Sequence, residues 1–240
     1  MKKFKSIGIL GGMGPEATLH LFNLIIKNTP ASKDQDHIPV IIYNNPLIPD
    51  RTMHIVYNEE SPLELLIEGA QRLERAGADM ILIACNTAHY YIKDIEPFIS
   101  IPVMDMIALT SLYISARRDI NVSGSIKAGI LATTGTINTS LYQSSLIEHN
   151  IEPLIPTPLE QQELVMEAVY GKKGIKAGYK RVPKQLIIKA ARLLIERGAD
   201  VIIAGCTEIP IVLRGSDIEA ELVNSMGVLA KEAVKKAKII

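Results

Sequence analysis

The chain has 240 residues, of which 48% are hydrophobic, and its 26 basic residues balance 26 acidic residues to a formal net charge of zero. This composition is ample for a buried core and excludes a disordered chain. A neutral chain has no overall field to attract phosphate backbones, so we expect no nucleic-acid partner. Two cysteines cannot form a disulfide scaffold, and no apolar run approaches the roughly 18 residues of a membrane helix. The N-terminus lacks a signal-peptide pattern, and we expect a soluble, cytoplasmic protein with no membrane partner.

The first half of the chain alternates short apolar runs with helical segments. A buried parallel strand is predicted at Ser6–Leu10, and further strands at Val40–Tyr43 and Met80–Ala84. A first helix is predicted from Pro15 to about Lys27. A second is predicted over Pro62–Ala76, with Ser61 before its start and Gly77 after its end. This alternation is typical of an α/β fold with a parallel sheet.

The second half shows the same order of elements. Strands are predicted at Lys127–Leu131, around Ile151–Leu154 and at Val201–Ala204, with a helix over Pro183–Arg197. We expect two α/β halves, residues 1–105 and 106–240, with a boundary near Ile99–Ala108. The final predicted helix, 218–238, could pack back on the first half.

The two halves match at one constant offset of 121 residues. The matched pairs include Gly8-Ile9-Leu10 with Gly129-Ile130-Leu131, Gly77-Ala78-Asp79 with Gly198-Ala199-Asp200, and Cys85 with Cys206. General similarity between βα units explains apolar runs, but it does not explain a constant shift. The sequence therefore predicts a duplicated chain, with the halves related by a pseudo-twofold axis and an active site in the cleft between them.

Both cysteines follow a predicted strand and precede a turn into a helix. Cys85 begins Cys85-Asn86-Thr87-Ala88-His89, and Cys206 begins Cys206-Thr207-Glu208. Ligand sites of parallel sheets form at the carboxyl ends of strands, and a helix N-terminus lowers the pKa of a thiol. One such cysteine would be read as a small core residue, but two at equivalent positions favour function. Two thiols on opposite faces of a substrate could invert a stereocentre by removing a proton on one side and adding one on the other.

One rival motif deserves comparison. The segment Gly12-Met-Gly-Pro-Glu-Ala17 fits the glycine pattern of dinucleotide-binding loops. That motif also requires an acidic residue at the end of the next strand, where this chain has Asn44-Asn45. No His or Cys cluster has metal-ligand spacing, so we expect neither a dinucleotide nor a metal.

Four segments together resemble the aspartate/glutamate racemase family over essentially the whole chain. They are Ile7–Thr18, Asn45–Arg51, Cys85–His89 and Gly205–Glu208. Within that family the chain is similar to the aspartate racemase branch. Glutamate racemases typically carry Asp-Ser in the first loop and His after the second Cys-Thr, where this chain has Gly11-Gly12-Met13 and Glu208.

The resemblance implies a cofactor-independent isomerase that interconverts L- and D-aspartate, with glutamate as a possible second substrate, and a homodimer. It implies Cys85 and Cys206 as the acid/base pair. It also implies that Arg51 and a lysine bind the substrate carboxylates. The family's Lys-Ala-Gly pattern matches Lys176-Ala177-Gly178, which leaves Lys172 and Lys173 as weaker candidates.

The chemistry of the residues agrees with this assignment, since an acidic amino acid needs cationic partners for its two carboxylates and a guanidinium suits bidentate binding. Further candidate binding residues lie near the predicted strand ends: Met13, Gly14, Asn86, Thr87, Thr133, Thr136 and Thr207. Each threonine or asparagine could equally be a helix cap, and Arg51 a surface residue. Glu208 could orient the Cys206 thiol, although a nearby carboxylate would raise its pKa. His89 is interpreted as a first-turn helix residue rather than a base.

Two alternatives remain open. The same scaffold could support chemistry like that of maleate isomerases or decarboxylases, although decarboxylases of this kind keep only one catalytic cysteine. The chain could also be a non-catalytic protein that binds a small acid.

Overall fold

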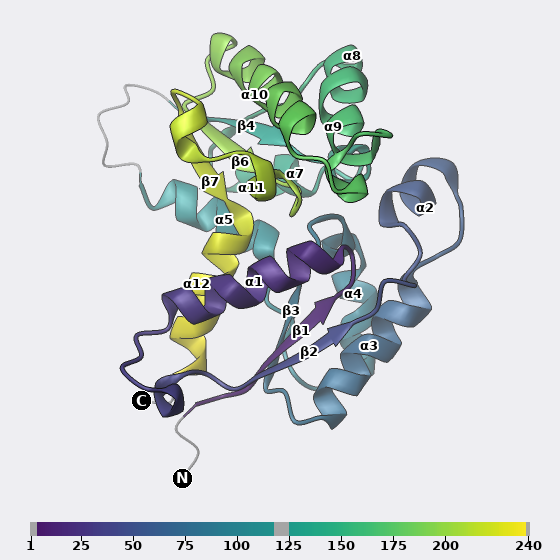
Figure 1. Ribbon diagram of the computed structural model, residues 1–240, viewed down its shortest axis with the longest axis vertical. Coiled ribbons are helices and arrows are strands. Elements are labelled where there is room, and N and C mark those ends of the chain that lie inside the picture. Colours follow the sequence, from purple (N-terminus) through teal and green to yellow (C-terminus); the bar gives the residue numbers. More distant parts are fainter. Residues whose placement is uncertain (1–3, 118–124, 239–240) are drawn as a thin grey trace. The chain divides into compact units, whose positions relative to one another are not determined.

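The computed structural model describes residues 4–117 and 125–238 (Figure 1). The chain divides into two compact units, one formed by Met1–Met106 with Met226–Ile240 and the other by Ile107–Ser225. Helix α12 (Ser225–Ala237) therefore belongs almost entirely to the unit that contains the N-terminal half. No helix in the described part of the chain is long and apolar enough to cross a bilayer.

The first unit is built on a parallel sheet of three strands in the order β2-β1-β3. The strands are β1 (Ile7–Gly11), β2 (Val40–Asn44) and β3 (Met80–Ile83). The three predicted strands are thus confirmed, each to within one residue at either end. They form because short apolar runs end in glycine or polar residues, and β1 and β3 are buried throughout.

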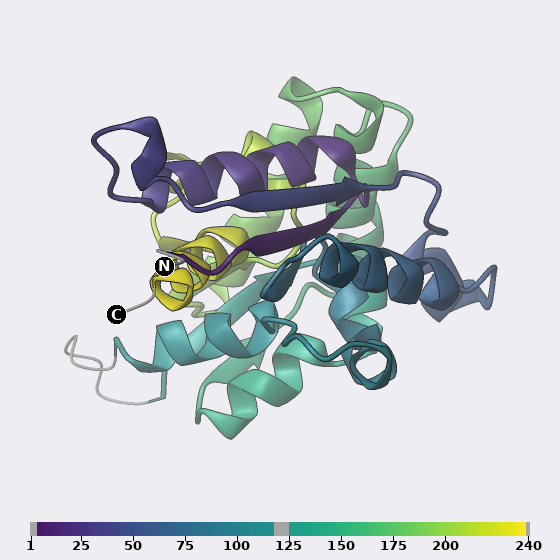
Figure 2. The ribbon, with the colours of Figure 1, turned by 90° about the horizontal axis from the view of Figure 1, so that it is seen from below.

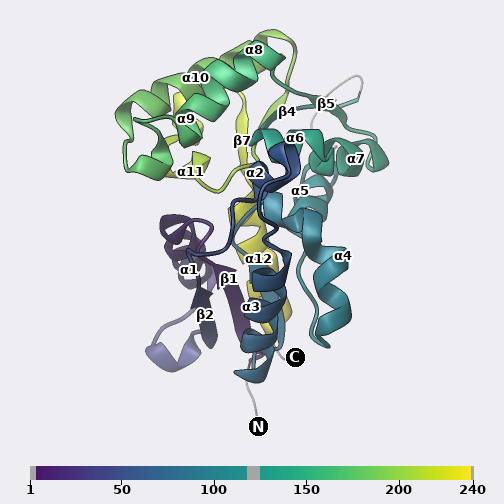
Figure 3. The ribbon, with the colours of Figure 1, turned by 90° about the vertical axis from the view of Figure 1, so that its right-hand side faces the viewer.

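Helices α1 (Pro15–Asn28) and α3 (Leu63–Arg75) connect these strands, as predicted. Because β2 and β3 lie on opposite sides of β1, two right-handed crossovers must place α1 and α3 on opposite faces of the sheet. Figures 2 and 3 show α1 beside β1 and β2, and Figure 3 shows α3 on their other side. The carboxyl ends of β1 and β3 therefore form a topological switch point, where open α/β sheets bind ligands.

Shorter elements complete this unit. They are η1 (Asp34–Asp36), α2 (Arg51–Tyr57), η2 (Thr87–Tyr91), α4 (Ile92–Ile95) and η3 (Glu96–Phe98). Helix α2 has no counterpart among the predicted elements. Asp50 is its N-cap, and its carboxylate accepts hydrogen bonds from the N–H groups of Thr52 (2.8 Å) and Met53 (3.1 Å).

The second unit is built on a parallel sheet of four strands in the order β5-β4-β6-β7. The strands are β4 (Lys127–Leu131), β5 (Glu152–Leu154), β6 (Val201–Ala204) and β7 (Glu221–Asn224). The prediction of the first three is confirmed, as is that of a helix before β6, α10 (Arg181–Glu196).

The predicted helix over 218–238 is wrong in its first part. Residues Glu221–Asn224 form β7, which pairs with β6 so that Val223 lies opposite Ile203. Helix α12 starts only at Ser225, whose hydroxyl donates to the carbonyl of Ala204 at 2.8 Å. The helical spacing of apolar residues in this segment is outweighed by the pairing that completes the sheet edge.

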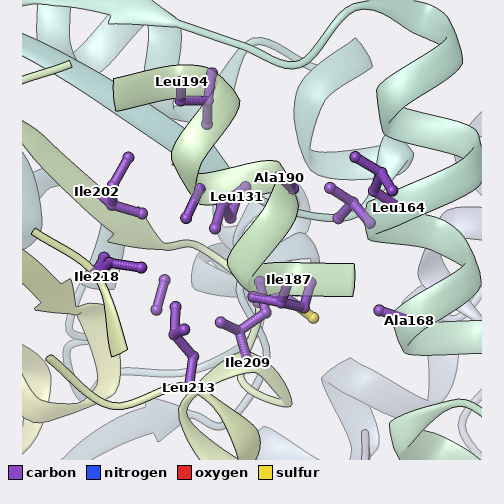
Figure 4. Close-up of a cluster of buried hydrophobic side chains, with 14 of the residues drawn as sticks. Leu131, Leu164, Ala168, Ile187, Ala190, Leu194, Ile202, Ile209, Leu213 and Ile218 are labelled. Carbon is purple, nitrogen blue, oxygen red and sulfur yellow. The ribbon is translucent and has the colours of Figure 1, made fainter. Parts of the chain in front are cut away.

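The remaining elements of the second unit are mostly short helical segments. They are α5 (Met106–Ser115), which starts in the first unit, α6 (Thr134–Asn138), α7 (Leu141–Glu148), α8 (Pro158–Glu160), the π-helical η4 (Gln161–Met166), α9 (Glu167–Tyr170), η5 (Ile175–Ala177), α11 (Ile209–Val212) and η6 (Gly215–Asp217). The core lies where α10 packs on β4 and β6. Figure 4 shows Ile187, Ala190 and Leu194 of α10 facing Leu131 of β4 and Ile202 of β6.

The duplication predicted from the sequence recurs in the hydrogen bonds of each unit. The Asp79 carboxylate accepts from the N–H of Ser6 at 2.6 Å, and the Asp200 carboxylate accepts from the N–H of Lys127 at 2.8 Å. In the first unit this bond links the start of β1 to the residue before β3. In the second unit it links the start of β4 to the residue before β6. The two halves therefore share local structure as well as sequence.

Candidate active site

The loop after β1 is shaped by Gly12, which has φ +98°. A Cβ on this residue would lie 2.3 Å from the backbone of Asn45, so no other residue fits without moving the chain. Its N–H donates to Thr18 Oγ1 at 2.9 Å. Met13, buried, and Gly14, the N-cap of α1, follow in the same loop at the carboxyl end of β1.

Arg51 is held beside this loop. Its Nη1 donates to the carbonyls of Ile48 (3.3 Å) and Pro49 (2.9 Å), and its Nη2 donates to the carbonyl of Met13 (3.2 Å). The residue is only 5% exposed, so the alternative of a solvated surface arginine is wrong. Three of its five N–H groups thus fix the guanidinium at the edge of the sheet.

Cys85 is the second residue after the end of β3. Its carbonyl lies 2.8 Å from Nδ1 of His89, which is buried. Burial lowers the pKa of His89, with an opposing effect from Asp105, so a neutral imidazole is favoured. This supports its interpretation as a structural residue. Asn86 and Thr87 are buried directly after Cys85.

Tyr91 also lies in this region and was not predicted. Burial is the main cause that raises the pKa of its phenol, while the charge of Arg51 lowers it and Cys85 and Asp50 raise it. Cys85 and Tyr91 also belong to the same buried hydrophobic cluster. No motif in the sequence marks Tyr91, which closes the 3-10 helix η2 that follows Cys85.

In the second unit, Cys206 lies two residues before a buried acid, Glu208. Its Sγ donates to Oε2 of Glu208 at 3.0 Å, and Thr207 Oγ1 donates to the same oxygen at 3.0 Å. Burial is the main cause that raises the pKa of Cys206, followed by the charge of Glu208, with a smaller opposing effect of Lys176. The prediction of a lowered pKa is therefore wrong for Cys206. The helix that follows, α11, has only four residues, so its dipole is too short to offset burial.

Lys176 joins this group from η5. Its Nζ lies 3.3 Å from Oε1 of Glu208 and 5.2 Å from the ring centroid of Tyr170, and its side chain is 28% exposed. The neighbouring Lys172 and Lys173 are exposed on the preceding turn. Of the three candidate lysines, the structure brings Lys176 to the Cys206 region.

The loop after β4 holds Thr133 and Thr136, which are buried with their Oγ1 atoms 3.4 Å apart. Gln161 was not predicted in this region. Its Nε2 donates to the carbonyl of Ala132 at 2.9 Å and to Thr134 Oγ1 at 3.3 Å. It starts the π-helical η4, and π-helical turns are frequent at functional sites.

Both units thus place a free, buried thiol at the carboxyl edge of the sheet. Within residues 4–117 and 125–238, no three His, Cys, Asp or Glu side chains are grouped as metal ligands. The fold and these two residues define a duplicated α/β protein with one thiol at the switch point of each sheet.

Comparison with known proteins identifies the family. The Asp/Glu/hydantoin racemase family matches residues 10–233. The chain is 30% identical over 234 residues to the broad specificity amino-acid racemase RacX of Bacillus subtilis strain 168, covering 95% of this chain and 96% of that one. Among solved structures, the aspartate racemase of Picrophilus torridus has a TM-score of 0.82 at 28% identity, covering 96% of this chain and 93% of that one. An aspartate racemase homologue from Pyrococcus horikoshii OT3 has a TM-score of 0.74 at 26% identity, covering 98% of both.

The chain belongs to the Asp/Glu/hydantoin racemase family. It is an amino-acid racemase of this family, and therefore an isomerase that acts on a small molecule.

Proposed function

We propose that the protein racemises aspartate, with glutamate as a second substrate, and that Cys85 and Cys206 perform the proton transfers without pyridoxal phosphate or a metal. The observation that carries this proposal is the equivalence of the two cysteines, because each is the second residue after a matching strand, β3 in one unit and β6 in the other. An inversion at Cα requires a base on one face and an acid on the other. Two equivalent thiols provide both.

The environment of Cys206 supports a defined starting state. A raised pKa keeps this thiol protonated, and its hydrogen bond to Glu208 orients the proton. In this state Cys85 acts as the base, taking the Cα proton as Cys206 donates to the opposite face. The other enantiomer requires the reverse, with the Cys206 proton first released.

The substrate carboxylates need cationic partners. Arg51 in the first unit is buried and oriented, which suits one carboxylate, and Lys176 in the second unit suits the other. Asn86 and Thr87 would supply polar groups in the first unit together with the backbone of Met13–Gly14. Thr133, Thr136 and Thr207 would do the same in the second.

A second candidate is a racemase of broader specificity. Lys176 is already paired with Glu208, so its charge is partly neutralised before any substrate binds. A weakened cation at Lys176 would bind a second carboxylate less tightly, which favours amino acids that lack one. The similarity to a broad specificity amino-acid racemase points the same way.

A chiral-chromatography assay distinguishes these proposals. L-aspartate, L-glutamate, L-alanine and L-lysine are each incubated with dialysed, chelator-treated enzyme. The proposal predicts the highest kcat/KM for aspartate. Equal or higher kcat/KM for alanine or lysine would establish the broader specificity instead. Activity that appears only after pyridoxal phosphate or a metal is added would contradict the cofactor-free mechanism.

We further propose a cytoplasmic homodimer. Two free thiols are typical of a reducing compartment, and the homodimer follows from the resemblance to racemases. Light scattering during size-exclusion chromatography measures the mass directly. A monomer mass of 26.3 kDa at micromolar concentration would contradict the dimer.

A further inference from the structure

Tyr91 carries a buried hydroxyl that makes no hydrogen bond within the described part of the chain. The residue is 3% exposed, and its Oη has no hydrogen-bond partner among the residues that the structure describes. A hydroxyl removed from water without a partner destabilises a protein, so such groups are rare and indicate a bound partner or a functional role.

The surroundings of Tyr91 are those of the candidate site. It packs in the same hydrophobic cluster as Met13, Ile48 and Cys85, and the charge of Arg51 acts on it. Burial raises the pKa of the phenol, so it stays neutral and can donate a proton in a hydrogen bond at any working pH. A neutral donor near a fixed guanidinium suits an anionic acceptor.

We propose that the Tyr91 hydroxyl donates a hydrogen bond to the substrate carboxylate that Arg51 binds. A carboxylate offers several lone pairs, so it can accept from both side chains at once. Tyr91 would then be a substrate-binding residue whose hydroxyl gains its partner only when substrate is present. This inference rests on the proposed function, because it takes the ligand to be an amino acid.

The chain offers a matched control in the adjacent residue. Tyr90 is 49% exposed, and its ring contacts that of Tyr91 edge-on with centroids 5.0 Å apart. Removing the hydroxyl of Tyr90 changes the same chemical group on the same helical turn, but on the solvent side. Tyr90→Phe is therefore expected to leave kinetics and stability unchanged.

The experiment compares Tyr91→Phe, Tyr90→Phe and the wild type in three measurements. The first is steady-state racemisation of both aspartate enantiomers. The second is the near-ultraviolet difference spectrum on adding racemic aspartate, with which no net reaction occurs. The chain has eight tyrosines and no tryptophan, so the tyrosine band, at longer wavelengths than phenylalanine absorbs, reports the phenols. The third is the thermal unfolding midpoint without substrate.

For Tyr91→Phe we expect a KM raised about 10-fold or more with kcat little changed, because the bond is present in both the ground and transition states. The tyrosine difference signal should weaken. The unfolding midpoint should stay equal or rise, since the hydroxyl lost had no partner in the protein. A purely structural hydroxyl would instead lower the midpoint and leave KM unchanged.

Each result decides one question. If the wild type racemises no amino acid, the proposed function fails. If the wild type is active and Tyr91→Phe keeps its KM and difference spectrum, the binding role of Tyr91 is overturned. A midpoint clearly below that of Tyr90→Phe would also overturn it, because the hydroxyl would then have a partner within the folded chain.

Discussion

The Sγ of Cys206 lies 3.0 Å from Oε2 of Glu208, and Lys176 contacts the other oxygen of the same carboxylate at 3.3 Å. The buried Glu208 carboxylate thus contacts a buried thiol from the same loop after β6 and the partly exposed ammonium group of Lys176 from η5. The charge of the carboxylate raises the pKa of the thiol, and the charge of the lysine lowers it by a smaller amount. The protonation state of Cys206 is therefore controlled by its neighbours as well as by burial.

Replacing Glu208 by Gln should make the Cys206 thiol ionise more readily. The pKa of Cys206 should fall because a negative charge and its hydrogen bond are lost, but only partway, since burial is the larger cause and remains. The measurement is the rate of iodoacetamide alkylation against pH in a Cys85→Ser background, where Cys206 is the remaining thiol. We expect faster alkylation of the Gln variant at each pH. Identical rate profiles would show that Glu208 has no influence on the thiol.

The raised pKa of Cys206 should also appear in the stability of the protein. Below about pH 8.5 the thiol is protonated in both folded and unfolded chains, so it adds no pH dependence. Above that pH the unfolded chain releases the proton first, and the free energy of unfolding falls as pH rises toward the folded pKa. The fall due to this group is at most about 1.4 kcal/mol per pH unit.

Urea unfolding of the wild type and Cys206→Ser, at about pH 7.5 and about pH 9.5, isolates this contribution. The difference between the two proteins should shift with pH, with the wild type losing more stability. Parallel losses in both proteins would mean that Cys206 titrates alike in the folded and unfolded states.

Arg51→Ala should reduce both catalysis and stability. Loss of a bidentate carboxylate contact should cost about 2–4 kcal/mol in transition-state binding, measured as kcat/KM. The carbonyls of Ile48, Pro49 and Met13 lose their donors, so the free energy of unfolding should fall by about 1–3 kcal/mol. Arg51→Lys should not restore kcat/KM, because one ammonium group cannot reproduce the fork.

The control for Arg51 is Arg192→Ala. The Arg192 side chain is 55% exposed and 4.0 Å from Glu219, a contact of little energetic weight. Its removal should change neither kcat/KM nor unfolding. Wild-type kinetics in Arg51→Ala would show that Arg51 serves only the loop.

The strands and the duplication could be predicted because short apolar runs between glycines have few alternatives to buried parallel strands. Strand β7 could not, because its four residues also fit the helical spacing of the segment around them, and only pairing with β6 decides between the two. Helix α2 has a typical N-cap residue in Asp50, but a Pro-Asp pair is equally typical of a turn.

Site residues could be predicted where they lie in a recognisable motif. Properties that depend on burial in the folded chain could not. Cys85, Cys206 and Lys176 lie in recognisable segments. The pKa of Cys206 was predicted in the wrong direction, because the shortness of α11 and the depth of burial depend on the fold. Tyr91 and Gln161 have no distinctive motif, and their buried polar atoms are visible only in three dimensions.

The two-base mechanism requires both thiols. Each single Cys→Ser variant should lose racemisation, since a serine hydroxyl is too weak an acid to replace a thiol with a reference pKa of about 8.5. Because the pair acts as a unit, the double variant should be scarcely worse than either single one. Full activity in Cys85→Ser or in Cys206→Ser would exclude that residue from the reaction.

Deuterium labelling in D2O tests the two-thiol mechanism most directly. With two bases, the proton leaves on one face and a solvent-derived deuteron arrives on the other. At early times the account predicts deuterium at Cα of the product enantiomer and almost none in recovered substrate, measured by mass spectrometry after chiral separation. Early labelling of both enantiomers at similar rates would contradict it, because a single base or a freely exchanging intermediate would then carry the reaction even if Cys85 and Cys206 were both essential.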